Sequence, residues 1–392
     1  MTKPLQSRSA RAASLGRPNP LRALTAVIDA VDGGINLGQG VCDLDPPKPL
    51  VDGALESIYG GAERQVYTPY LGLPELREQI ADHRRRFHGQ SVDPDQVVVT
   101  LGSSGAMVAV ATVFLDPGDE VLLFEPFYSY HRSALQLCGA TVRGVRLDSA
   151  NDLRFDPEAL RAAIGPKTKA VVVNTPANPS GKVFRRSELE QLAEVLAGTE
   201  ILVLTDEVYE HMVFDGLTHT APATVPGLED RSITLGSFSK TFSVTGWRIG
   251  YAIADAEAAE AIGRACDQLH VCAPRPMQRG VQRALEQLPE SFYRDLGRDY
   301  ERRRDRLCSA LTGRGFEVLR PEGAYYVLAD YRSVLGDLDP FDAAHAMIDR
   351  FRINGVPGDV FRFDAGSERT LRFHFAVDDE VLDEVVNRLT PS

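Results

Sequence analysis

Lys240 is the residue whose neighbours best suit covalent chemistry. It follows Ser237 and Ser239 in a short run of small residues, and Arg248 lies eight positions further on. A lysine amine can bind an aldehyde cofactor as a Schiff base, and small neighbours leave room for that cofactor. The serine hydroxyl and the guanidinium could hold a phosphate group that anchors it. The alternative is a solvated surface lysine, so residues elsewhere in the chain must decide.

Two further segments place suitable groups directly after predicted strands. Ser103 and Ser104 lie in a turn bracketed by Gly102 and Gly105, and this turn leads into a predicted helix. Free backbone N–H groups at a helix start, together with the helix dipole, bind phosphate well. Tyr128 follows the next predicted strand. Its ring could stack on a flat cofactor, although packing in the core is the commoner use of such a ring.

An amide, an acid and a phenol follow in the same way. Asn178 lies in a loop rich in proline, which can hold its amide towards a phenolic oxygen. Asp206 directly follows a buried apolar run, where a carboxylate needs a charged or hydrogen-bonded partner. A pyridinium nitrogen is a partner of that kind, and a helix N-cap role is the alternative. Tyr209 comes three residues later.

A sheet must position these residues. Short apolar runs rich in β-branched residues alternate with longer amphipathic segments from about residue 95 onward, which predicts a mostly parallel sheet covered by helices on both faces. In such sheets ligands bind at the carboxyl ends of the strands. The predicted strands are 97–100, 121–124, 170–174, 201–205 and 233–235, with helices at 106–115 and 187–197.

The pattern changes beyond about residue 285. A long charged helix at 295–311 precedes predicted strands at 316–319, 324–329 and 369–376, which indicates a smaller α+β domain. The apolar spacing before residue 46 suggests that this early segment packs against it. We therefore predict a large domain at 47–285 and a small domain formed by 1–46 and 286–392, with the first twenty residues as a basic arm. A cleft between two domains suits a small-molecule site.

Composition excludes several classes of partner. The 392 residues include 43 basic and 55 acidic residues, a formal net charge of -12, which argues against nucleic acid or an anionic membrane surface as the main partner. No stretch approaches the roughly 20 apolar residues of a membrane span. The five cysteines are scattered without the close pairs of a zinc or redox site, so we predict no metal, reduced thiols and a cytoplasmic location.

The motifs together resemble one family. Their order and wording are similar to those of the class I and II aminotransferases, which are fold-type I pyridoxal-phosphate enzymes, and closest to the kynurenine and glutamine transaminase branch. The resemblance implies a seven-stranded type of sheet in the large domain and pyridoxal 5'-phosphate as cofactor. It is carried by Asn178-Pro-Ser-Gly, Asp206-Glu-Val-Tyr209, Ser237-Phe-Ser-Lys240 and Gly246-Trp-Arg248, and extended by the segments 36–40 and 371–376.

The resemblance implies a role for each of these residues. Lys240 would carry the cofactor as a Schiff base and move a proton during turnover. Asp206 would keep the pyridine nitrogen protonated, while Tyr209 and Asn178 would hold the ring hydroxyl oxygen. Tyr128 would stack on the ring. The phosphate would be bound by Ser103, Ser104, Ser237 and Arg248.

The substrate side is also implied by the family. Arg372 would clamp the substrate α-carboxylate, with Asn178 and the backbone of Gly40 assisting; an interior salt bridge is the competing role for this arginine. Tyr67 resembles the tyrosine that reaches the phosphate in the neighbouring subunit. Each active site would then require a homodimer.

Some positions depart from the kynurenine branch. Leu21 and Ser104 stand where that branch has aromatic residues, and the segment 270–276 lacks its aromatic-histidine pair. We therefore expect a roomier and more polar pocket than one for kynurenine. His270 or Arg275 could project into it from the partner subunit, and the alternative is that both lie on a surface loop.

The predicted activity is transfer of the amino group of an L-α-amino acid to a 2-oxo acid. The same cofactor residues would also serve a lyase, a γ-replacement enzyme or a cyclase with another side-chain pocket. A non-catalytic binding protein on the same fold is a further alternative, disfavoured because the lysine, the acid and the arginines are all present. The side chain of the amino donor is not identified by these motifs.

Overall fold

The structure is a computed structural model that describes residues 20–42, 44–148, 152–364, 366 and 368–391; the side chains of Pro20 and Leu21 are also outside the description. The predicted basic arm therefore lies almost entirely outside the described residues. No helix in the described part of the chain is both long enough and apolar enough to cross a membrane.

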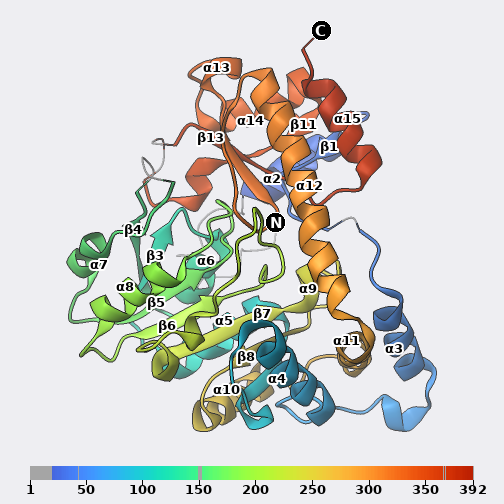
Figure 1. The fold of residues 1–392 in the computed structure, drawn as a ribbon, viewed down its shortest axis with the longest axis vertical. Coiled ribbons are helices and arrows are strands. Elements are labelled where there is room, and N and C mark those ends of the chain that lie inside the picture. Colours follow the sequence, from blue (N-terminus) through green and yellow to red (C-terminus); the bar gives the residue numbers. More distant parts are fainter. Residues whose placement is uncertain (1–19, 43, 149–151, 365, 367, 392) are drawn as a thin grey trace, which may run out of the picture.

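A seven-stranded sheet forms the larger layer of the molecule (Figure 1). All its strands are parallel except β8, which runs antiparallel to both of its neighbours. The mostly parallel sheet and its five predicted strands are confirmed. The strand order is β2 (Val97–Thr100), β8 (Gly250–Ile253), β7 (Ser232–Ser237), β6 (Leu202–Asp206), β5 (Thr168–Asn174), β3 (Glu120–Glu125) and β4 (Thr141–Arg146).

Strands β4 and β8 were not predicted. Strand β4 lies at the sheet edge and exposes part of its length, so its apolar run is interrupted by Arg143 and Arg146. Strand β8 is only four residues long and begins with glycine. Strand β4 therefore lacks the continuous apolar run of an internal strand. Strand β8 lies in such a run, but its glycine and alanine are poor strand formers.

Helices cover both faces of this sheet, because successive strand residues point to opposite sides. Val98 packs into one apolar cluster with α5, α6 and α10, whereas Val97 and Val99 pack into another with α4 and α11. The helices are α3 (Lys48–Tyr59), α4 (Pro74–His88), α5 (Gly102–Phe114), α6 (Ser129–Leu137), α7 (Pro157–Ala163), α8 (Arg186–Leu196), α9 (Phe238–Thr241), α10 (Ala256–His270) and α11 (Arg275–Gln287).

The C-terminal third forms a second, smaller layer. A four-stranded sheet has the order β12 (Val356–Pro357), β13 (Thr370–His374), β10 (Tyr326–Asp330) and β9 (Glu317–Leu319). The long helix α12 (Glu290–Arg314) extends from this part towards α11 (Figure 1). The other helices here are α13 (Arg332–Leu335), α14 (Pro340–Phe351) and α15 (Asp379–Leu389).

The early segment packs against this smaller part, as its apolar spacing suggested. Strand β1 (Ile35–Asn36) pairs in parallel with β11 (Ile353–Asn354), and Leu24 of α2 (Pro20–Asp29) lies in the same apolar cluster as α12, α14 and α15. In Figure 1 the blue α2 and β1 accordingly lie beside the orange and red C-terminal elements. This pairing brings residues 36–40 next to β13, which carries Arg372.

Candidate active site

A cavity with a volume of about 80 Å³ lies at the carboxyl ends of β5, β6 and β7. Every residue predicted to bind the cofactor, apart from Tyr67, lines it. An adjoining cavity of about 230 Å³ shares Ser103, Ser104, Tyr128 and Asp206. The lining residues of the first cavity are Ser103, Ser104, Tyr128, Asn174, Asn178, Asp206, Val208, Tyr209, Ser237, Ser239, Lys240, Thr245 and Arg248.

Lys240 enters the cavity from the short helix α9. Ser237 caps this helix by accepting a hydrogen bond from the backbone N–H of Ser239 at 3.2 Å, which fixes the turn that follows β7. The half-buried Lys240 donates from Nζ to the carbonyl oxygen of Gly40 at 3.3 Å, and Nζ lies 5.3 Å from the ring centroid of Tyr325. Within the described residues no carboxylate pairs with this amine.

The start of α5 and Arg248 form one end of the cavity. Helix α5 begins at Gly102, so Ser103 and Ser104 lie in its first turn rather than in a preceding loop as predicted. Gly102 has a φ of +71°, and a Cβ there would lie 2.6 Å from a guanidinium nitrogen of Arg248. Glycine is therefore required for this close approach.

Arg248 has hydrogen bonds only to carbonyl oxygens in the described part of the chain, those of Thr245 at 3.2 Å and Leu101 at 3.3 Å. A guanidinium without a carboxylate thus faces the free N–H groups and hydroxyls of a helix start. This combination of donors suits a phosphate dianion. The residues present therefore fit the phosphate end of pyridoxal phosphate.

Asp206 is buried and pairs with a histidine. Its Oδ2 lies 2.6 Å from Nε2 of His131, and Oδ1 accepts a hydrogen bond from the N–H of Val208 at 3.4 Å. The chain after Asp206 turns without forming a helix, so the alternative N-cap role is wrong. His131 was missed by sequence reasoning, although it lies on the helix that Tyr128 starts.

Asn174 joins the loops that follow β5 and β6. Its Nδ2 donates to the carbonyl oxygen of Asp206 at 2.9 Å, and its Oδ1 accepts from the backbone N–H of Asn178 at 2.7 Å. This side chain holds Asn178 and Asp206 at a fixed spacing. It was also missed, because a single asparagine at the end of a strand is an ordinary turn residue.

Tyr209 lies in a group of three buried tyrosines. Its hydroxyl donates to that of Tyr326 at 3.2 Å, and its ring packs edge-on against Tyr325 with centroids 5.1 Å apart. Burial, followed by the neighbouring Tyr326, raises the pKa of Tyr209 well above its usual value. Tyr209 therefore keeps its proton and remains a hydrogen-bond donor. Tyr325 and Tyr326 come from the smaller sheet, and sequence spacing did not connect them with this cavity.

Arg372 is 2% exposed and has no carboxylate partner among the described residues. One guanidinium nitrogen donates to Oδ1 of Asn178 at 2.8 Å and another to the carbonyl oxygen of Gly38 at 2.6 Å. Its guanidinium carbon lies 4.3 Å from the ring centroid of Tyr326. The competing prediction of an interior salt bridge finds no partner in this part of the chain.

The glycines near Arg372 have separate contacts. Gly38 accepts the hydrogen bond from Arg372, whereas the carbonyl oxygen of Gly40 accepts from Lys240 and, at 3.0 Å, from the hydroxyl of Tyr325. The carbonyl oxygen of Gly40 thus contacts the lysine, and that of Gly38 contacts the arginine. A Cβ on Gly40 would collide with the phenol of Tyr326, so this position requires glycine unless Tyr326 moves.

Some predicted residues lie elsewhere. Tyr67 is 77% exposed and does not line the cavity of its own chain; its carbonyl oxygen accepts a hydrogen bond from Arg275 at 3.1 Å. Neither Arg275 nor His270 lines the cavity of this chain. The side chain of Leu21, the other altered position, lies outside the description.

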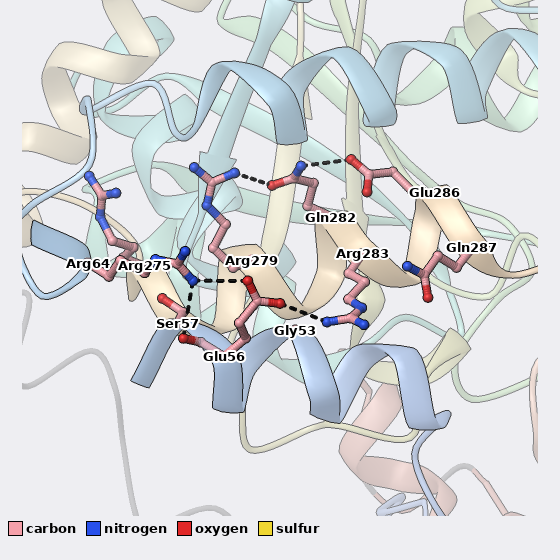
Figure 2. A pocket seen from close by; sticks show the side chains of 10 residues that line it. All are labelled: Gly53, Glu56, Ser57, Arg64, Arg275, Arg279, Gln282, Arg283, Glu286 and Gln287. Atoms are coloured by element: carbon pink, nitrogen blue, oxygen red, sulfur yellow. Dashed lines mark hydrogen bonds and ion pairs between the residues drawn. The ribbon is translucent and has the colours of Figure 1, made fainter. Parts of the chain in front are cut away.

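A larger hollow of about 480 Å³ lies between α3 and α11 (Figure 2). It is lined by four arginines, two of which pair with Glu56. Figure 2 also shows Gln282 accepting from Arg279 and donating to Glu286. Its size exceeds that of the Lys240 cavity, but no lysine lines it, so it offers no amine for a Schiff base.

Comparison with known proteins agrees with the fold and with this cavity. The model of the family "Aminotransferase class I and II" matches residues 32–389, and the chain belongs to this family. Because the enzymes of this family and fold use pyridoxal phosphate, the protein is a pyridoxal-phosphate-dependent aminotransferase. The predictions of family, fold class, cofactor and enzyme class are confirmed.

Three relatives illustrate the likeness. A probable N-succinyldiaminopimelate aminotransferase of Mycobacterium tuberculosis is 36% identical over 91% of this chain and 92% of its own. Kynurenine–oxoglutarate transaminase 3 of Mus musculus is 31% identical over 89% of this chain and 82% of its own. The solved structure of N-succinyldiaminopimelate aminotransferase from Mycobacterium tuberculosis superposes with a TM-score of 0.92 at 34% identity, covering 98% of this chain and 99% of that one.

Proposed function

We propose that the residues of the Lys240 cavity bind pyridoxal phosphate in one defined orientation. The phosphate lies at Ser103, Ser104, Ser237 and Arg248, and the ring lies against Tyr128 with its nitrogen towards Asp206. The unpaired guanidinium of Arg248 at the glycine-containing helix start supports this direction. When bound, the cofactor supplies an aldehyde carbon for an amino group and a ring that accepts electrons.

The protein supplies positioned donors, acceptors and one mobile proton. Lys240 moves a proton at Nζ to and from the α-carbon of the amino acid. Asp206, held by His131 at 2.6 Å, keeps a carboxylate beside the ring nitrogen. The hydroxyl of Tyr209, which here donates to Tyr326 at 3.2 Å, would donate its one O–H to the ring oxygen instead. Asn178 presents its NH₂ group there too, because its oxygen is already bonded to Arg372.

The observation that carries the substrate assignment is the buried Arg372 without an acid. A buried cation with no counter-ion is costly, and a substrate carboxylate would balance it. The planar guanidinium, already oriented by Asn178 and Gly38, suits two-pronged binding of a carboxylate. We infer that Arg372 binds the α-carboxylate of the amino donor and then that of the 2-oxo acid.

A panel experiment tests this function. The protein is mixed with single amino acids, among them the donors in the relatives' names, N-succinyldiaminopimelate and kynurenine. Cofactor absorbance and the matching 2-oxo acid are measured. Conversion to the amine form of the cofactor with one 2-oxo acid per chain supports transamination. Release of ammonia or of a side-chain leaving group without the amine form would favour the lyase or replacement alternative.

We also propose a homodimer in which Tyr67 reaches the phosphate site of the partner subunit. Large apolar side chains are exposed on α3 and the loop after it, with Tyr59 at 83%, Val66 at 56% and Tyr67 at 77%. Exposed large apolar side chains gathered on neighbouring segments are common at interfaces. Light scattering after size-exclusion chromatography tests the dimer, and a monomeric mass with full activity would contradict it.

The division into a large domain at 47–285 and a small one at 1–46 with 286–392 is likewise a proposal. It is supported by the separation of the two sheets and by the pairing of β1 with β11. We place the enzyme in cytoplasmic amino-acid metabolism, in a biosynthetic role. The five cysteines support that location, because none of them forms a disulfide.

A further inference from the structure

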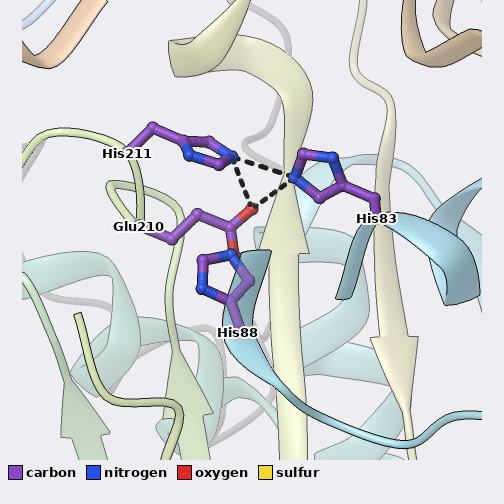
Figure 3. A group of neighbouring side chains, drawn as sticks. All are labelled: His83, His88, Glu210 and His211. Atoms are coloured by element: carbon purple, nitrogen blue, oxygen red, sulfur yellow. Dashed lines mark hydrogen bonds and ion pairs between the residues drawn. The ribbon is translucent and has the colours of Figure 1, made fainter. Parts of the chain in front are cut away.

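Three histidines and a glutamate meet beside the turn that follows β6 and carries Tyr209 (Figure 3). His83 and His88 come from the last turns of α4, while Glu210 and His211 come from the turn after β6. Their side chains are 3–7% exposed. One potential ligand atom from each of the four lies within 4.8 Å of the others. The active site uses none of them.

Three of the ligand atoms form a triangle whose shortest side is the hydrogen bond between His83 and His211. Nε2 of His83 lies 2.9 Å from Nε2 of His211, and the same two atoms lie 3.6 and 3.7 Å from Oε1 of Glu210. Zinc bound at about 2.0–2.1 Å in a tetrahedron requires ligand atoms about 3.3 Å apart. The separations lie close to this value. Both distances to Glu210 are also too long for hydrogen bonds.

His88 provides the fourth side. Its side chain is 3% exposed, and neither of its ring nitrogens has a hydrogen-bond partner among the described residues. Nε2 of His88 lies 3.0 Å from Oε2 of Glu210, and its ring points to the carboxylate in Figure 3. A buried imidazole without a hydrogen bond is costly. Coordination of an ion at this position would remove that cost.

The surrounding charge also favours a cation. Arg84 is fully buried and bridges two carboxylates, with one guanidinium nitrogen 2.7 Å from Glu207 and another in contact with Glu210. Two carboxylates therefore face this one guanidinium. A bound divalent cation would offset the excess negative charge.

We propose that His83, Glu210 and His211 bind one zinc ion, with His88 as the fourth ligand. Imidazole nitrogens and a carboxylate oxygen are the donor types that zinc accepts. A closed set of four protein ligands leaves no open position, so the ion is structural. The ion connects the end of α4 to the turn after β6. It thereby holds Asp206 and Tyr209, which line the Lys240 cavity, in place. The phenyl ring of Phe87 and the phenol ring of Tyr293 cover the site.

Metal titration of the holoenzyme tests this site. The protein is purified without a polyhistidine tag, stripped with a chelator and titrated with Co²⁺ and then Zn²⁺. We expect the visible absorption of tetrahedral Co²⁺ to saturate at one ion per chain, and Zn²⁺ to displace it. Absence of this absorption from the wild-type protein overturns the proposal and leaves a hydrogen-bonded histidine cluster. This measurement needs no variant, so a folding defect cannot confuse it.

Variants then locate the ion. His211→Ala and His83→Ala should each weaken Zn²⁺ binding by at least about tenfold, since loss of even an outer-shell partner costs that much. His345→Ala is the matched control, because His345 is exposed on α14. It should bind as the wild type does. Unchanged affinity in both cluster variants would overturn the proposal, as the ion would then bind elsewhere, for instance at the cofactor phosphate.

Discussion

One short segment, residues 206–211, serves two regions that treat charge in opposite ways. Asp206 and Tyr209 face the Lys240 cavity, whereas Glu207, Glu210 and His211 face the cluster beneath it. In the cavity, cationic side chains stand without carboxylates in the described part of the chain. In the cluster, Arg84 is bound by two carboxylates and the histidines crowd around them.

This difference in charge pairing distinguishes a site that binds ligands from a cluster that holds the backbone in place. Unmatched cations beside open space mark where anionic groups of a cofactor and substrate can bind. Charges that are paired within the protein hold a backbone segment in place. Their burial has a desolvation cost, which is offset only when the geometry of the pair is good. The turn after β6 belongs to both regions. The rigid cluster around Arg84 therefore positions the residues of this turn that face the Lys240 cavity.

The largest expected effect is on Lys240. Lys240→Ala should lower kcat by at least about 10³-fold, because it removes both the covalent anchor and the proton carrier. The chain should still fold, and borohydride reduction followed by mass measurement should show no attached cofactor. Lys48→Ala, which removes an exposed lysine on α3, is the control. A cofactor still attached in Lys240→Ala would refute the assignment.

Arg84→Met tests the second region, the cluster in which Arg84 contacts Glu207 and Glu210. It leaves two buried carboxylates without their guanidinium, so the free energy of unfolding should fall by about 3–5 kcal/mol. Arg85→Met is the matched control one residue later on α4, where the side chain is 57% exposed, and should change stability by less than about 1 kcal/mol. Urea unfolding measures both. Equal effects of the two substitutions would show that the buried pairing has no special weight.

Arg372→Lys tests whether a buried cation without a carboxylate partner binds the substrate. It keeps the charge and loses the planar fork, so KM for the amino acid should rise about 10- to 100-fold. The cofactor spectrum should stay close to that of the wild type, because Arg372 does not line the Lys240 cavity. Steady-state kinetics with the donor identified in the panel measure the change. A fall in kcat at constant KM would place this arginine in the chemical step instead.

The pKa of His374 depends on its burial and on the neighbouring cation Arg372. Burial, and then the neighbouring Arg372, lower the pKa of His374 to about 3. In the unfolded chain a histidine has a pKa near 6.5, so the unfolded state takes up the proton first as the pH falls. This stability is complete above about pH 6.5 and is lost as the pH falls towards 3.

His374→Gln should therefore flatten the pH dependence of unfolding. Between pH 7 and pH 5 we expect the wild type to lose up to about 2 kcal/mol more than the variant does. Urea unfolding at both pH values measures this, with His345→Gln as the exposed control. Parallel losses in the wild type and His374→Gln would mean that this imidazole is not held neutral.

The sequence was most informative where one strand or turn carries its own signal. The runs at 97–100, 121–124, 170–174, 201–205 and 233–235 became strands because they are apolar and covered on both faces. The polar residues directly after them had to meet at one edge, since the carboxyl ends of parallel strands lie together. Their roles towards the cofactor stay predictions.

Contacts between distant segments were missed. His131 reaches Asp206 from a different strand connection, and Tyr326 reaches Tyr209 from the smaller sheet. The search for metal ligands followed cysteine spacing, whereas His83 and His211 are 128 positions apart. No local pattern could join them.

The sequence by itself determined five strands of the sheet, the order of the chemical groups along the chain and the family, because periodicity and short motifs are local properties of the chain. Only the tertiary structure decided which charges are matched. Arg84 and Arg372 are both buried arginines, and nothing near either one in the sequence reveals that the first meets two carboxylates and the second meets none. Matching depends on how distant segments pack, and packing is set by the whole fold.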